Sequence, residues 1–186
     1  MRSKLDEQMG AVNHSLIQMG AICEEAIALA ARALLNGEKQ LAQKLEPLAV
    51  EMDQMERDVE NMCMKLLLRQ QPVAGDLRRV SAAMKLVTDM KRISDQAEDI
   101  AEIIQAMEMT SEADLEEIHV MAQAVIRMVT LSVDAFVHDN LILADRVIAS
   151  DDIVDDGFDR VRESLVKMIA EDPDQGGKVL DLLMIA

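Results

Sequence analysis

The chain has 186 residues, of which half are apolar but only two are aromatic, and its formal net charge is −16. This length can bury a full core without disulfides or a metal, and so acidic a chain repels nucleic-acid phosphates and anionic lipid head groups. The apolar residues are mainly Met, Leu, Ile, Val and Ala, with seven glycines and three prolines, which favours an all-α fold over a strand-rich one.

The N-terminus and the cysteines indicate a cytoplasmic protein. The first seven residues turn acidic at once, and no apolar run approaches the roughly 18 to 20 residues that a membrane span requires. Cys23 and Cys63 have no CxxC spacing, which fits reduced thiols better than a disulfide framework. We therefore expect neither a signal peptide nor a transmembrane helix.

The first predicted helix runs from Leu5 to the pair Asn36-Gly37. Its apolar positions recur at alternating steps of four and three, which is one seam of a long amphipathic helix. Cys23 belongs to this seam, so we expect its side chain in the core. Asn36 and Gly37 tolerate the left-handed conformation that ends a helix, and Glu38 begins the next one.

Two further helices follow in the first half of the chain. The second ends at the corner Gln70-Gln71-Pro72, and Pro47 is expected to kink or interrupt it near its start. The third begins near Gly75 and keeps its apolar rhythm for more than six turns. Three long helices with short corners predict an antiparallel bundle. Residues 110–114 read as a linker into a new N-cap, so we place the units at residues 1–109 and 114–186.

The second unit repeats the first at an offset of 102. Met19 falls on Met121 and Asp53 on Asp155, and the order of helices and corners is the same. This period is too long for a solenoid repeat and indicates a tandem duplication. Because few residues follow the second corner at 171–173, we expect a truncated last helix and an open apolar groove in the second half.

The third helix carries the most unusual charge pattern. Asp95 and Asp99 lie one turn apart, opposite the apolar seam, where they could share a cation with carboxylates of a neighbouring helix. The simpler interpretation is a solvated acidic face in which Lys91 pairs with Asp95. Spacing alone favours the solvated face.

Histidines provide the alternative interpretations. Glu116 and His119 have the Glu-x-x-His spacing of di-iron bundles, so the alternative function is a ferritin-like metal-dependent oxidase or a metal-binding helical bundle. Such a site needs a second copy of the motif, and neither His14 nor His138 has a Glu three residues before it. His14 also raises the hypothesis of histidine phosphotransfer. Without a Gly-rich phosphate loop or a nucleophile–histidine pair at family spacing, we expect no enzyme.

The run QQPVAGDLR at residues 70–78, with the helix that follows at 88–97, resembles the PhoU family of phosphate-uptake regulators. The resemblance covers the whole chain, because that family is built from two tandem three-helix, spectrin-like units. In family members the chain continues through one more helix that carries a second copy of an acidic motif. The resemblance therefore implies two tandem three-helix bundles with the C-terminal helix truncated.

The resemblance also implies a function. It indicates a non-enzymatic regulator that links a phosphate ABC transporter to a sensor histidine kinase and holds the phosphate-starvation response off when phosphate is plentiful. The implied partners are the transporter's ATPase subunit, the kinase and a second copy of the chain. The protein would be cytoplasmic, without nucleic acid and without direct membrane insertion.

A metal site is the last implication of the resemblance. Some family members bind iron or other metal clusters through an E(D)xxxD motif on the third helix of each unit. Asp95 occupies the last position of this motif, but Lys91 stands where the family has a carboxylate. Asp99 restores the spacing one turn later. The implied ligands for iron or another divalent or trivalent metal are therefore Asp53, Glu56, Asp95 and Asp99.

Overall fold

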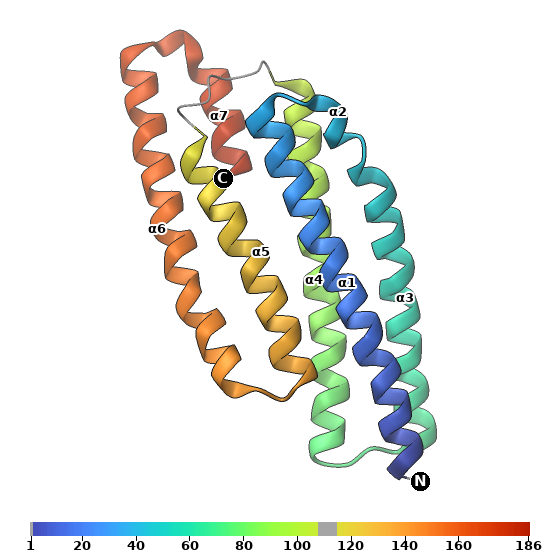
Figure 1. The fold of residues 1–186 in the computed structure, drawn as a ribbon. Coiled ribbons are helices and arrows are strands. Elements are labelled where there is room, and N and C mark those ends of the chain that lie inside the picture. The colour runs from blue at the N-terminus through green and yellow to red at the C-terminus, as the bar shows by residue number, and fades with distance from the viewer. Residues whose placement is uncertain (1, 108–114) are drawn as a thin grey trace.

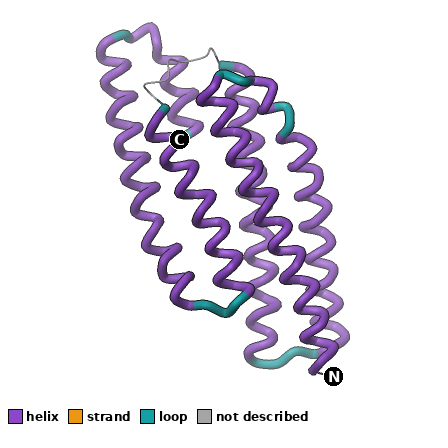
Figure 2. The backbone as a smooth tube through the Cα atoms, viewed as in Figure 1, coloured by secondary structure: helices purple, strands orange, loops and turns teal. Residues whose placement is uncertain are grey.

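The computed structural model describes residues 2–107 and 115–186, which form helices joined by short corners and include no strand (Figures 1 and 2). The all-α prediction is confirmed. In chain order the helices are α1 (Arg2–Asn36), α2 (Lys39–Ala42), α3 (Leu45–Gln70), α4 (Gly75–Ala106), α5 (Glu116–Val137), α6 (Leu141–Glu171), the 3-10 helix η2 (Pro173–Gln175) and α7 (Gly176–Ile185).

The long helices run side by side along one axis (Figure 1). α1 packs against α3, α4 and α5, while α6 packs along α5 and meets η2 and α7 at its end. Helix boundaries in the second half recur 101 positions after those in the first, as α1 ends at Asn36 and α5 at Val137. α7 has 10 residues, whereas α4 has 32.

Corner residues end the helices largely as the sequence predicts. Gly37 has a φ of 69°, which is the left-handed conformation expected after α1. After α3, Gln71 and Ala74 also have positive φ values, both 47°, on either side of Pro72-Val73. Positive φ is unfavourable for residues with a Cβ, so this corner holds two strained positions.

The interruption predicted near the start of the second helix is present, but it does not lie at Pro47 itself. The helix breaks before the proline, at Gln43-Lys44, and divides into α2 and α3. Pro47 then lies in the first turn of α3, where its missing N–H has no intrahelical acceptor to lose. α6 has no proline in its interior and is continuous.

Two groups of buried side chains form the core, and α1 contributes to both. One contains the N-terminal half of α1 with α3 and the first half of α4, and it includes Val129 and Val133 of α5. The other joins the C-terminal half of α1 to α2 and the end of α4, and to α5, α6 and α7. Cys23 is fully buried, as predicted, and its Sγ donates to the Met90 carbonyl oxygen at 3.3 Å.

The domain bounds 1–109 and 114–186 stay a prediction, because the proposed linker at 110–114 lies outside the described residues.

Among the described residues, one helix is long and apolar enough to cross a membrane by length and composition. This is α5, with a mean hydropathy of 1.6 and 17% of the 18-residue window buried. The expectation that no segment reaches this length is therefore wrong for α5, which lies between α1 and α6 (Figure 1).

Candidate functional site

Charged side chains line the edge of the contact between α3 and α4. Asp53 follows the buried Met52 on α3, and Lys91 follows the buried Met90 on α4. A residue next to a buried position on a helix lies at the border between the interface and solvent. Asp95 lies one turn beyond Lys91 on the same border, so charges from both helices meet there.

Lys91 is the centre of this arrangement. Its Nζ donates to Oδ1 of Asp53, across the helix interface, at 2.9 Å, and it also donates to Oδ1 of Asp95. The Lys91 side chain is only 20% exposed, against 44% for Asp53 and 43% for Asp95. The pair Lys91–Asp95 predicted for a solvated face is confirmed, and the bond to Asp53 extends it across two helices.

The surroundings shift the pKa values of three groups. Burial, followed by the charge of Glu60, raises the pKa of Glu56 above its ordinary value. Burial, followed by the charge of Asp95, does the same to the pKa of Glu98. Burial alone would lower the pKa of Lys91, but the hydrogen bonds to its two aspartates outweigh it and raise that pKa. The ammonium therefore stays charged among carboxylates that repel one another.

The predicted ligands do not all come together. Asp53 and Asp95 both bond to Lys91, and all three of these groups act on the pKa of Glu56. Asp99 is exposed instead, and its Oδ2 accepts a hydrogen bond of 3.4 Å from Gln96.

Glu98 is a member of the cluster that the metal prediction leaves out. It lies next to the buried Ala97 and close to Asp95, Glu102 and Glu46 of the neighbouring helix. The sequence could have predicted this position, because Glu98 is seven residues after Lys91 and therefore lies on the same face of the helix.

A bound metal does not fit this arrangement. The carboxylates that the resemblance assigns to iron or another metal already surround an ammonium group. In residues 2–107 and 115–186, no three His, Cys, Asp or Glu side chains gather as a metal-binding group. We derive no metal chemistry from the cluster, and the site at Asp53, Glu56, Asp95 and Asp99 stays a prediction.

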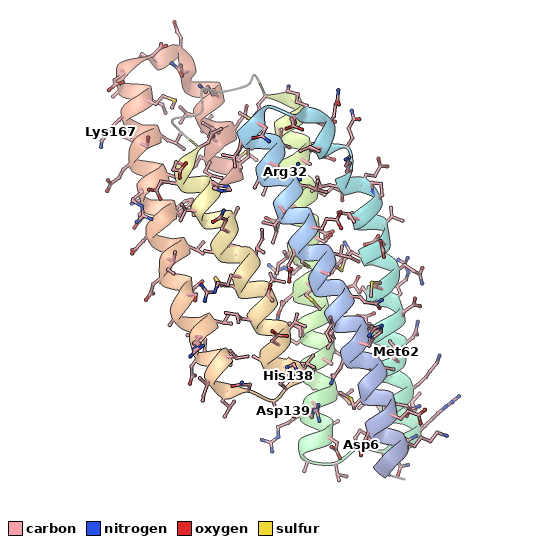
Figure 3. The ribbon with its side chains drawn as sticks, viewed as in Figure 1. Asp6, Arg32, Met62, His138, Asp139 and Lys167 are labelled. Atoms are coloured by element: carbon pink, nitrogen blue, oxygen red, sulfur yellow. The ribbon has the colours of Figure 1, made fainter. Side chains whose placement is uncertain are left out.

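The histidines lie elsewhere. Glu116 is exposed at the start of α5, and Nε2 of His119 lies 2.8 Å from the Gln123 amide nitrogen. His14 is exposed on α1. Figure 3 shows His138 at the corner between α5 and α6, where its Nδ1 lies 3.0 Å from the Asp134 carbonyl oxygen. None of these contacts supports the ferritin-like oxidase or the phosphotransfer hypothesis.

A cavity of about 610 Å³, lined mainly by apolar side chains but also by Arg92 and Asp95, lies between α1, α4 and α5 and reaches the end of α7. The groove that was expected in the second half is therefore not confined to it. It is formed as much by the first unit as by the second, because its walls include Ile27, Leu34, Ile100, Met121, Val125 and Ile185.

The fold is an all-α bundle in which the order of helices is repeated. Its candidate site is a cluster of charged side chains at the border between α3 and α4. Residues 16–104 and 118–186 match the PhoU domain. These two segments cover most of the chain, and the chain belongs to the PhoU family.

Relatives and solved structures agree with this assignment. The PhoU homologues of Aquifex aeolicus and Synechocystis sp. are 32% and 34% identical, over 98% and 100% of this chain and 83% and 81% of their own. The crystal structure of PhoU from Pseudomonas aeruginosa has a TM-score of 0.91 at 30% identity, covering 97% of this chain and 87% of that one. PhoU from Streptococcus pneumoniae, at 20% identity, shares the fold with a TM-score of 0.84.

Proposed function

We propose that this chain is a non-enzymatic regulator that links a phosphate ABC transporter to a sensor histidine kinase. Its relatives in Aquifex aeolicus and Synechocystis sp. are named phosphate-specific transport system accessory proteins, and this match over almost the whole chain carries the proposal. Membership of that family supports a role related to phosphate transport. The proposed regulator is cytoplasmic, binds the transporter's ATPase subunit and the kinase, and keeps the phosphate-starvation response off.

The surface of the bundle supports a docking role. Leu68 and Val73, at the corner between α3 and α4, are 74% and 72% exposed. Arg69 is next to Leu68, and Arg78 lies in the first turn of α4. Contiguous exposed apolar side chains with a polar rim indicate a site of protein contact. The corner therefore offers a basic and apolar end on a chain whose net charge is strongly negative.

Co-purification tests the adaptor. The tagged chain is captured from cells grown in high and in low phosphate, and the ATPase subunit and the kinase are detected in the eluate. We expect both partners in high phosphate. Failure to recover either partner under both conditions would contradict the adaptor role.

A reporter of the phosphate-starvation response tests the direction of regulation. Deleting the gene should switch the reporter on in high phosphate, and the wild-type chain should switch it off again. A reporter that stays off after deletion would contradict negative regulation while leaving the binding result intact.

Sedimentation of the purified chain tests the proposed homodimer, whose mass would be twice 20.6 kDa.

A further inference from the structure

The border between α3 and α4 gathers several carboxylates around one cation. Asp53 and Glu56 come from α3, and Asp95 and Glu98 come from α4. Like charges at such short range destabilise the contact between the two helices unless a cation lies between them. In this chain the cation is the Lys91 ammonium, which bonds to one aspartate on each helix.

Another lysine on α4 shows that this bridge is more than local spacing. Lys85 pairs with Asp89, also four residues later, with 2.8 Å between Nζ and Oδ1. The Lys85 side chain is 72% exposed, whereas that of Lys91 is 20% exposed, and only Lys91 reaches a carboxylate on α3. Lys85 thus forms an ordinary pair within one helix, and Lys91 cross-links two.

We infer that Lys91 is a tethered cation that takes the place of a bound metal between α3 and α4, so that this part of the protein packs independently of metal. Because a four-carbon side chain attaches the Lys91 ammonium to its own helix, this group supplies positive charge without a binding equilibrium. This inference does not depend on the proposed regulatory role. It accounts for the disagreement between the metal ligands implied by resemblance and the arrangement of these side chains.

The experiment compares the wild-type chain with Lys91→Glu and with the matched control Lys85→Glu, all purified in full length. Thermal unfolding is followed by circular dichroism with Mn²⁺ or with a chelator, and bound manganese is measured by elemental analysis after dialysis. Mn²⁺ is chosen because it prefers oxygen ligands.

The wild-type Tm should be the same with Mn²⁺ and with chelator. Lys91→Glu should lower the Tm by about 2 to 4 °C in chelator, and Mn²⁺ should restore most of that loss and remain bound stoichiometrically. Lys85→Glu should neither bind manganese nor respond to it, although its change of charge is identical.

Three results would overturn the inference. The first is stoichiometric metal in the wild-type chain that is lost in Asp53→Asn. The second is equal manganese binding by the Lys91→Glu and Lys85→Glu variants. The third is a Lys91→Glu variant that binds no manganese and has the same Tm as the wild type. Should Lys91→Glu fail to fold, Lys91→Gln replaces it. This neutral variant should bind more manganese than the wild type, and equal binding would again overturn the inference.

Discussion

The second helices of the two units, α3 and α6, follow the same plan and differ sharply in burial. α3 buries six residues along 26, while α6 buries three along 31. α3 packs against both α1 and α4, whereas most of α6 has only α5 beside it. An apolar period in the sequence therefore selects the face of a helix that turns inward, and the number of neighbouring helices decides how much of that face is buried.

Equivalent acidic residues show the same contrast. Asp53 on α3 is half-buried and bonds to Lys91, while Asp155, with which the sequence offset of 102 aligns it, is exposed on α6. Asp155 forms no salt bridge within the described parts of the chain. A repeated carboxylate thus takes part in a cross-helix bond only where a neighbouring helix supplies the cation.

The largest difference is expected between two leucines. Leu66 on α3 is fully buried and Leu141 on α6 is 79% exposed. Leu66→Ala should lower the free energy of unfolding by about 2 to 5 kcal/mol, because it leaves a cavity in the core. Leu141→Ala should change it by less than about 0.5 kcal/mol. Urea denaturation measures both values, and similar losses would contradict the burial contrast.

A pair of glycines tests the contact between α5 and α6. A Cβ added to Gly157 on α6 would lie 2.5 Å from Cγ of Met121 on α5, whereas one added to Gly10 on α1 would meet nothing within 4 Å. Gly157→Ala should lower the free energy of unfolding by about 1 to 2 kcal/mol, since overpacking outweighs the gain in helix propensity. Gly10→Ala should raise it by about 0.5 to 1 kcal/mol. Stabilisation by both substitutions would show that α5 and α6 pack loosely.

The start of the second helix differs between the units. In α6 the Asn140 side chain accepts from the backbone N–H groups of Ile142 and Leu143, while Glu38, before α2, makes no such bond. Asn140→Ala should therefore cost about 1 kcal/mol of stability. Glu38→Ala serves as control, with an expected change under about 0.5 kcal/mol. Thermal melts of the two variants measure the loss of stability. Equal losses would contradict the prediction that Asn140 caps its helix and Glu38 does not.

The smallest effect is expected at Glu56, and it depends on pH. Because the pKa of Glu56 is raised in the folded chain, its charged form costs stability at neutral pH. Glu56→Gln should then stabilise the protein by less than about 1 kcal/mol at pH 7. The advantage should shrink as pH falls from the raised folded value toward the unfolded value of about 4.3. Urea denaturation across this range measures it.

Glu51→Gln, an exposed position on the same helix, is the matched control for this series and should behave like the wild type throughout. An advantage of Glu56→Gln that persists at low pH would point to a packing effect instead of a titrating carboxyl.

Most of the fold follows from local signals in the sequence. The apolar period predicts the long helices, and Gly37 and Pro72 mark corners that the structure confirms. Pro47 shows the limit of such signals. Proline is unfavourable inside a helix but acceptable in the first turn, so the sequence shows that the helix is interrupted and leaves open on which side.

The candidate site is predictable only in part, for a different physical reason. The pair Lys91–Asp95 lies on one helix, so its spacing reveals it. The bond from Lys91 to Asp53 depends on how far α3 is shifted along α4, and this register comes from the packing of the whole bundle. A cross-helix partner therefore needs the structure.

α1 has a consequence for how the protein unfolds. One helix of 35 residues contributes side chains to both core groups, with α3 and α4 on one side and α5 on another. Unfolding the helices around either core group would expose apolar side chains of α1 and weaken the packing of the other core group. We therefore expect the two halves of the chain to unfold together, as one cooperative body.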